Sequence, residues 1–234
     1  LGGTIGIRPG TMKLKDISGP DGNPDGVVDA YDITVIGDTN PDFAGGFGFN
    51  GNLYDFDFNI NFTYKVGNDI YNANKIQTMS RYRAGTYPNM REEMRQSNSY
   101  SYINPETGVL MTSLEDLAKW NEGANAKEYW SPFSTGDAVV VPTDWAMDDA
   151  SFLRLQSVTV GYTLPKKITS KFGVQRLRAY VTGTNLFVIT SYPGFDPEVS
   201  SYARNSSYSG LTPGIDFSSY PKSRAFTFGL NVTL

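Results

Sequence analysis

The sequence predicts an all-β fold whose antiparallel strands cross a membrane as part of a β-barrel. Aromatic residues make up 14% of the chain and are punctuated by 24 Gly and 13 Pro, a mixture typical of strands joined by many turns. Several segments alternate strictly between apolar and small polar residues, which is the period of a strand with one apolar face. Short and long connections between these segments follow one another in turn, as they do in outer-membrane barrels.

Five strands are expected, over 42–52, 57–66, 152–164, 176–190 and 224–234. The last one is the clearest, because Phe226 and Phe228 begin an apolar series that continues at every second residue to Leu234. The fourth strand changes parity between Gly183 and Leu186, which predicts a β-bulge. Parity alone does not separate a barrel strand from a strand of a soluble sandwich, since both have one apolar face.

The connections between the strands decide in favour of a barrel. Those at 53–55 and 165–173 are short, whereas those at 67–150 and 191–223 are long. If the last strand ends in the periplasm, both long connections and residues 1–41 lie outside the cell. Within the longer connection, Asn89-Met-Arg-Glu92 and Ser113-Leu-Glu-Asp116 each place an acid three residues after a capping residue, which predicts two short helices.

The composition excludes several classes of function. The chain has no His and no Cys, so a Ser-His-Asp triad, a thiol nucleophile, a His or Cys zinc site and a disulfide framework cannot be built from it. Its formal net charge of −4 gives no basic excess for nucleic acid. A glycosidase would need a specific pair of carboxylates, and nothing singles out one pair among the 24 acids. No apolar run is long enough for a membrane-spanning helix. Because the triad, thiol and zinc chemistries are excluded and no carboxylate pair stands out, we expect no enzyme.

Long stretches of the sequence resemble the C-terminal part of SusC/RagA-type TonB-dependent outer-membrane transporters. The resemblance is carried by DDASFLRLQSVTVGYTLPKK, LRAYVTGTNLFVITSYPGFDPEVS and GIDFSSYPKSRAFTFGLNVTL, and by PGTMKLKDISGPDGNPDGVVDAYD and VIGDTNPDFAGGFGFNGNLYDFDFNINFTYKVGNDIYN before them. YWSP at 129–132 belongs to the same pattern. It implies a barrel of about 22 strands that is closed by a plug domain.

The resemblance also implies a function and a set of partners. Such a transporter imports glycans or peptides across the bacterial outer membrane, draws on TonB in the periplasm through an N-terminal part, and is capped by a SusD-like surface lipoprotein. Five strands cannot close a barrel, and residue 1 is neither Met nor the start of a signal peptide, so we expect a piece of a longer polypeptide. Its partners would then include the rest of the barrel, the plug and the membrane lipid. The alternative is a soluble extracellular calcium-containing β-sandwich that binds glycans.

Residues 1–41 contain a motif of the kind that binds calcium. Oxygen ligands with the spacing of a 12-residue EF-hand loop are offered by Asp21, Asn23, Asp25, the carbonyl of Val27, Asp29 and Asp32, with Gly26 at the sharp turn. The departure is Asp32, where the pattern has the longer Glu. We expect a structural calcium ion at this motif in the external loop 1–41, which precedes the barrel strands of 42–234; the alternative is a solvated acidic turn.

Two further groups of residues are candidates for contact with a substrate. Strand parity places seven polar side chains towards the barrel lumen, where they line the transport path or contact the plug: Asp57, Asn59, Asn61, Lys65, Arg178, Tyr180 and Asn231. The external loop 67–150 carries aromatic side chains that either stack on a ligand or pack the loop on itself: Trp120, Trp130, Trp145, Tyr82, Tyr87, Tyr100 and Tyr102.

Overall fold

The chain forms two compact units in a computed structural model that describes residues 9–79, 89–133, 142–198, 214–217 and 219–234. One unit, which we call the loop unit, combines Leu1–Ile36 with Asn72–Ala146. The other, the strand unit, combines Gly37–Tyr71 with Met147–Leu234. The long connection thus divides from the strands that flank it and groups with the N-terminal residues. Among the described residues, every helix is too short or too polar to cross a membrane.

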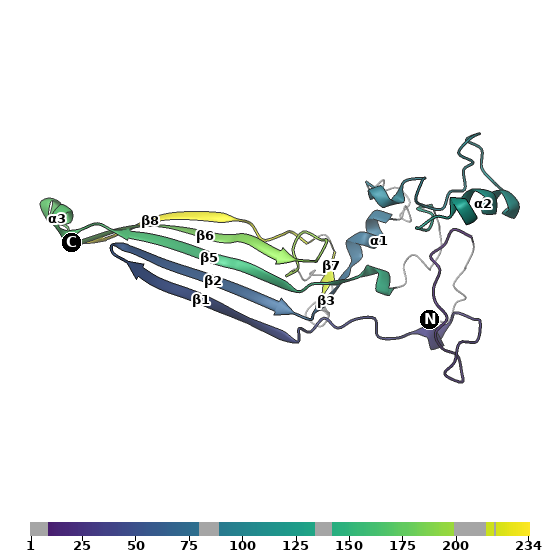
Figure 1. Cartoon of the computed structure of the whole chain (residues 1–234), viewed down its shortest axis with the longest axis horizontal. Helices are drawn as coiled ribbons and strands as arrows, with labels where there is room; N and C mark the ends of the chain where they lie inside the picture. The colour runs from purple at the N-terminus through teal and green to yellow at the C-terminus, as the bar shows by residue number, and fades with distance from the viewer. Residues whose placement is uncertain (1–8, 80–88, 134–141, 199–213, 218) are drawn as a thin grey trace, which may run out of the picture. The chain divides into compact units, whose positions relative to one another are not determined.

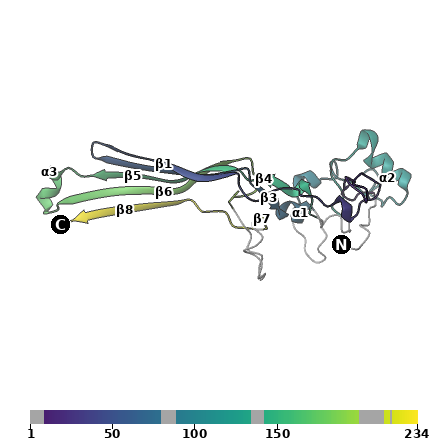
Figure 2. The ribbon, with the colours of Figure 1, turned by 90° about the horizontal axis from the view of Figure 1, so that it is seen from below.

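The strand unit is built on one five-stranded sheet with the order β1-β2-β5-β6-β8, in which all neighbours are antiparallel (Figures 1 and 2). These strands are β1 (Phe43–Leu53), β2 (Phe56–Val66), β5 (Phe152–Thr163), β6 (Arg176–Thr190) and β8 (Ala225–Thr233). All five strands expected from the sequence are confirmed, with bounds that differ by one residue at most. The short connections are confirmed as well, because only Tyr54 and Asp55 join β1 to β2.

The register of the sheet gives it one apolar face and one polar face. A single row across the apolar face joins Gly51, Phe58, Val160, Val181 and Phe228. Within the described residues no second sheet covers this face, and Phe228 is 80% exposed. A β-sandwich needs a second layer at that position, so the structure does not support the soluble sandwich alternative.

The predicted β-bulge lies where the sequence placed it. The pairing of β5 with β6 shifts between Leu155 and Ser157, and Asn185 on β6 has a left-handed φ of 51°. The pairing of β2 with β5 shifts at the same level, between Asn61 and Phe62. Because both shifts occur together, Leu155 continues the apolar face beside Phe62, and the two-faced character of the sheet is kept along its whole length.

A second, three-stranded sheet was not expected from the sequence. It has the order β4-β3-β7, with β3 (Asp69–Asn72) between β4 (Met147–Asp149) and β7 (Ile215–Asp216), and we call it the collar sheet. It brings together both ends of the connection 67–150 and a segment of the connection 191–223. Ile70 and Ala150 form a small core there with Tyr192, whose hydroxyl donates to the buried Asp216 carboxylate at 2.7 Å.

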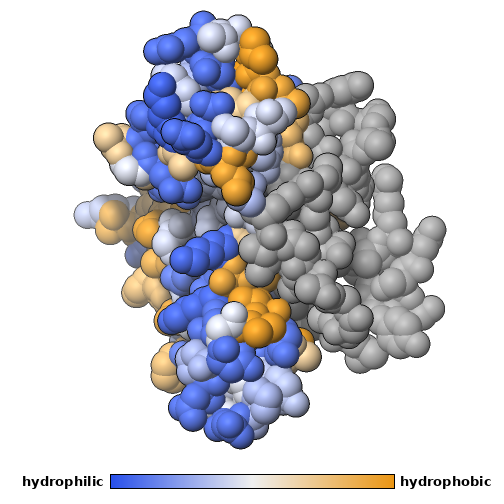
Figure 3. Space-filling model, turned by 90° about the vertical axis from the view of Figure 1, so that its right-hand side faces the viewer, coloured by the Kyte–Doolittle hydropathy of each residue, from blue (hydrophilic) through white to orange (hydrophobic). Residues whose placement is uncertain are grey.

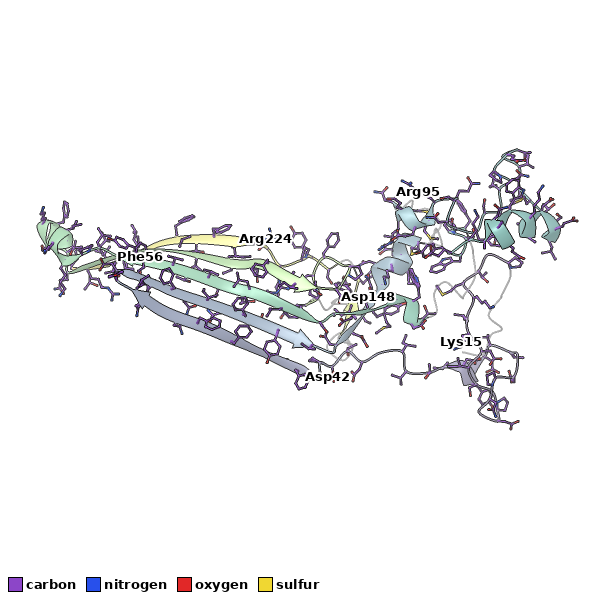
Figure 4. All side chains as sticks on the ribbon, in the orientation of Figure 1. Lys15, Asp42, Phe56, Arg95, Asp148 and Arg224 are labelled. Atoms are coloured by element: carbon purple, nitrogen blue, oxygen red, sulfur yellow. The ribbon has the colours of Figure 1, made fainter. Side chains whose placement is uncertain are left out.

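The turn between β5 and β6 has its own helical structure. It contains α3 (Lys166–Thr169) and a 3-10 helix (Ser170–Phe172), which ends at Gly173 with a left-handed φ of 70°. Figure 4 shows Phe56 close to this end of the sheet, whereas Asp42, Asp148 and Arg224 lie towards the opposite end. The short turns are therefore at one end of the strands, and the collar sheet and the starts of the two long connections are at the other.

The loop unit is held together by a methionine-rich core. Met12, Met79, Met94 and Trp130 are buried together, and partly buried side chains pack against them. Its helices are α1 (Ala73–Met79) and α2 (Leu114–Asn121), with 3-10 turns at Ala30–Asp32, Glu92–Met94, Gly123–Asn125 and Asp144–Ala146. Figure 3 looks at the molecule from the side on which α2 lies in Figure 1, and there hydrophilic residues surround smaller hydrophobic patches.

One of the two predicted helix caps is confirmed. Ser113 caps α2, because its Oγ accepts a hydrogen bond from the backbone N–H of Asp116 at 3.1 Å. The prediction at Asn89 is wrong, since that segment forms only the 3-10 turn Glu92–Met94, whose N-cap is Arg91 without a capping side chain. Glu92, the acid of the expected cap, instead pairs with Arg95 at 3.0 Å.

Candidate functional site

The polar face of the main sheet carries several groups of hydrogen-bonded side chains. Asn59 donates to Asn50 on the neighbouring strand, and Asn61 donates to Asn59 and to Ser157. Farther along the face, the hydroxyls of Thr159 and Thr182 lie 2.8 Å apart. Polar groups on four strands thus satisfy one another, as polar groups must where the wall of a barrel faces its interior.

An ion pair spans three strands of this face. Asp57 on β2 accepts two hydrogen bonds from Arg178 on β6, from Nε at 2.7 Å and from Nη2 at 2.5 Å. Strand β5 lies between the two residues, and there Gly161 is paired with Asp57. A Cβ at position 161 would stand 2.4 Å from both the Arg178 guanidinium and the Asp57 carboxylate. The bridge therefore exists because residue 161 has no side chain, a signal that sequence reasoning missed.

The same region places Tyr180 flat against the sheet. The Arg178 guanidinium lies 4.9 Å from the centre of the Tyr180 ring. The ring covers Gly229 on β8, where a Cβ would meet it at under 3.0 Å. Two glycines thus create a shallow polar surface at the short-turn end of the sheet.

Six of the seven residues predicted to face the lumen lie in these contacts or beside them. Asn231 is paired with Arg178 in the register of β6 and β8 and so shares its row. Lys65 lies on the same face of β2 as Asp57 but at the far end of the strand, away from the ion pair. The structure brings the set onto one face of one sheet, and contact with a substrate or plug stays a prediction.

At the end of the sheet opposite the short turns, a buried ion pair ties described residues of the connection 191–223 to β5. Arg154 on β5 donates from Nη2 to Asp196 at 2.5 Å, and both side chains are almost completely buried. Asp196 also accepts from the backbone N–H groups of Glu198 and Lys222. The carboxylate of Glu198 lies 3.4 Å from Arg154 and pairs with the Lys222 ammonium. Two loop carboxylates therefore meet one strand arginine, and Lys222 contacts both of them, a site absent from the sequence predictions.

The pKa values of two loop residues differ from their usual values. Burial by itself would raise the pKa of Asp196, but the backbone N–H donors and the charge of Arg154 outweigh burial and hold that pKa below its usual value. For Tyr192, burial raises the pKa of the hydroxyl well above its usual range, and the hydrogen bond to Asp216 acts in the same direction. At neutral pH the loop is thus held by a charged carboxylate and by a neutral tyrosine.

The calcium-type motif folds as a tight loop whose carboxylates accept backbone N–H groups. Asp32 accepts from Ile17 and Ser18 through Oδ1 and from Asp29 through Oδ2. These backbone donors, Asp29 foremost, lower the pKa of Asp32. Asp25 accepts from Val27, and Asp29 accepts from Tyr31. Gly22 and Gly26 have the left-handed φ values that such a turn needs.

An additional acid, Asp16, was missed by the motif search. Its Oδ2 accepts from Gly26 at 2.6 Å, and its Oδ1 is buried without a hydrogen-bond partner. In the part of the chain that the structure describes, no three acidic side chains are yet gathered in the geometry of a metal site. The oxygen-only donors suit a hard cation in kind, but Asp32 would have to exchange backbone donors for a metal. The calcium site stays a prediction.

The predicted loop aromatics divide into packed and exposed ones. Trp130 is buried in the methionine-rich core, and its ring meets Trp145 edge-on at 4.8 Å. Trp120 is partly exposed on α2, beside Lys119. Tyr100 and Tyr102 line an open cleft of about 370 Å³ together with apolar side chains that include Phe133. Tyr82 and Tyr87 lie outside the described residues. Packing therefore accounts for two of the three tryptophans.

Sequence comparisons relate almost the whole chain to one kind of protein. It is 31% identical over 231 residues, 96% of its length, to TonB-dependent receptor P3 of Formosa agariphila. It is 36% identical over 92 residues, 38% of its length, to TonB-dependent receptor SusC of Bacteroides thetaiotaomicron. These matches cover 19% and 8% of the relatives, so the chain spans no more than about a fifth of the curated relatives it matches. No protein-family model matches the chain.

Solved structures agree on the fold. The RagAB peptide importer matches in its "open-open" state with a TM-score of 0.61 and in its "closed-closed" state with a TM-score of 0.62. Each match covers 92% of this chain and 20% of the solved chain, at 17% and 18% sequence identity respectively.

An antiparallel sheet with an exposed apolar face, a hydrogen-bonded polar face, short turns at one end and long loops at the other is the wall of an outer-membrane type of β-barrel. The relatives identify which kind of barrel it is. The chain belongs to the TonB-dependent receptors, the family that includes SusC.

Replacing Gly161 tests the three-strand bridge. A methyl group in Gly161→Ala pushes the Arg178 and Asp57 side chains apart, and we expect a loss of about 1 kcal/mol in unfolding free energy, because the pair is partly exposed. The measurement is urea unfolding of the folded protein in detergent. Gly51→Ala is the matched control, since a Cβ there meets nothing within 4 Å. Equal stability of the two variants would contradict the bridge.

Replacing Asp196 tests the loop anchor and its dependence on pH. Asp196→Asn leaves Arg154 buried beside one weaker partner, and we expect a loss of about 3 kcal/mol together with faster proteolysis of the loop 191–223. Because the folded pKa of Asp196 is lowered, its contribution is complete above the ordinary value of 3.8 and disappears as the pH falls through the folded pKa. In the variant that part of the pH dependence should vanish. The exposed Glu115→Gln is the control; an identical pH profile for all three proteins would sink the interpretation.

Proposed function

We propose that this chain forms part of the wall and the external loops of a TonB-dependent importer in the bacterial outer membrane. The single observation that supports the proposal most is the relationship to TonB-dependent receptors along 96% of the chain. The sheet agrees with it, because an apolar face with Phe228 at 80% exposure suits lipid, whereas the opposite face carries linked polar groups. The remaining strands, the plug domain and the TonB contact would come from the rest of such a protein.

The proposed cargo is a glycan or an oligopeptide delivered with a SusD-like surface lipoprotein. The family includes SusC, and the solved structures of similar fold are those of a peptide importer, so both substrate classes are kept. In this proposal the polar face from Asn50 to Asn231 lines the path or holds the plug, and the external loops meet the lipoprotein. The described side chains offer hydrogen bonds and stacking rather than a reaction centre.

Uptake by cells lacking the gene tests the proposal. Deletion should abolish growth on the glycan or peptide that the transporter imports, while growth on a small sugar that enters through general porins stays normal. Removal of TonB should give the same loss, because uptake in this class needs energy from the inner membrane. Parallel cultures on glycans and on oligopeptides as sole nutrient separate the two substrate classes. Unchanged growth on every member of both classes would contradict import.

We further propose that the motif from Asp21 to Asp32 holds a structural calcium ion. In support, the loop offers only oxygen donors, and the buried Oδ1 of Asp16 has no partner that would compete with a metal. Calcium would stabilise this loop without taking part in transport.

Limited proteolysis of residues 9–36 tests the calcium site. Calcium should slow cleavage near Gly22, because a ligand that binds only the folded loop stabilises it, by about 2.7 kcal/mol at a hundredfold excess over Kd. Asp21→Asn should remove the effect, and this side chain accepts no hydrogen bond from the described residues. Glu106→Gln, at an exposed loop position, is the matched control. Equal cleavage rates with calcium and with chelator would rule the site out.

A further inference from the structure

We propose that the turn between β5 and β6 is a docking surface for phospholipid headgroups. The surface consists of α3 and the following 3-10 helix, residues 166–172, and its occupant is the phosphate and glycerol layer of a bilayer. This inference rests on the proposed function, because it needs β5 and β6 to cross a membrane.

The position of the turn places it at the edge of the apolar band. Phe56 and Tyr162 face each other across β2 and β5, and their ring centres lie 4.7 Å apart. Aromatic pairs of this kind mark the interface between hydrocarbon and headgroups in barrels. Strand β5 ends one residue after Tyr162, and the helical turn begins three residues later, so residues 166–172 come at the depth of the headgroups.

Two apolar side chains of the turn enter no core formed by the described residues. Ile168 is 46% exposed and Phe172 is 77% exposed, and because they are four residues apart they share one side of the helical turn. The backbone holds them in place: Ile168 N–H donates to Pro165, Val174 N–H donates to Thr169, and Thr169 itself is buried. On the neighbouring turn at the same end of the sheet, Tyr54 is 95% exposed. These exposed apolar side chains gain free energy where an apolar environment receives them.

The positive charge of the turn indicates which apolar partner it binds. Lys166, Lys167 and Lys171 are exposed and form no ion pair with the described residues. The chain is acidic as a whole, with a net charge of −4, yet residues 150–195 contain no Asp or Glu at all. Lysines next to exposed apolar side chains match a surface that is anionic outside and hydrocarbon inside, which is a phospholipid layer. An acidic protein would match the lysines but would leave Phe172 without an apolar environment.

Spin labels on single introduced cysteines test the depth of the turn; this chain has no cysteine of its own, and any cysteine in the rest of the transporter is first replaced by serine. The complete transporter carries Phe172→Cys, Phe228→Cys on the lipid face of β8, or Leu114→Cys on α2, in vesicles of phosphatidylcholine with one quarter phosphatidylglycerol. Exposure to oxygen and to a water-soluble nickel chelate is then measured. We expect oxygen exposure at 228, chelate exposure at 114, and intermediate exposure to both at 172.

The alternative outcomes are distinguishable. If 172 behaves like 114 while 228 contacts lipid, the barrel stands and the docking surface is overturned. If 172 is shielded from both reagents, a protein covers the turn, and the lipid proposal is likewise overturned. If 228 is exposed only to the chelate, the proposed function fails, and the docking surface fails with it.

Charge substitution tests the role of the lysines. With Lys166→Gln, Lys167→Gln and Lys171→Gln combined, the preference for phosphatidylglycerol over phosphatidylcholine bound to the transporter should fall, by up to about fivefold for each lysine, as counted by native mass spectrometry. The control combines Lys13→Gln, Lys15→Gln and Lys119→Gln, which changes the net charge equally in the loop unit and should leave the preference unchanged. The same preference in both variants would overturn the electrostatic part of the proposal.

Discussion

Backbone hydrogen bonding at the edges of the main sheet is the constraint on which the rest of this structure depends. In hydrocarbon, every backbone N–H and C=O needs a partner within the protein. Strands β2, β5 and β6 have neighbours on both sides, but β1 and β8 have a neighbour on only one side among the described residues. In a bilayer this sheet therefore requires further strands against both of its edges. Curated relatives about five times as long contain room for them.

The two faces of the sheet carry different residues, large apolar side chains on one and linked polar side chains on the other. On the apolar face, large side chains such as Phe228 remain exposed, because lipid rather than protein would cover them. On the polar face, Asp57 and Arg178 must reach across β5, a span of about 9.6 Å between outer strands. The missing side chain of Gly161 leaves room for both to lie flat. Glycine is thus as important to the polar face as any charged residue, because it determines which charges can meet.

Strand positions and faces were predictable from the sequence because their cause is local. Alternation with a period of two is written into each strand, and even the bulge at Asn185 follows from a break in parity. The helix at Ser113 was predictable for the same reason, since a cap and its N–H donor are three residues apart. The Asn89 prediction failed, and Glu92, the acid of the expected cap, pairs with Arg95 instead. Partners far apart in the sequence, such as Arg154 and Asp196, left no periodic signal at all.

The collar sheet holds described ends of both long connections beside one another. The long connection leaves through β3 and returns through β4, and these two strands pair directly, Ile70 opposite Asp148. The connection 191–223 joins them through β7, where the Asp216 carboxylate accepts a hydrogen bond from the Tyr192 hydroxyl. The backbone pairing of β3 with β4 and the buried Tyr192–Asp216 hydrogen bond hold the described ends of the two connections beside one another. Everything between β3 and β4 can then differ in length and composition without altering the register of the barrel wall.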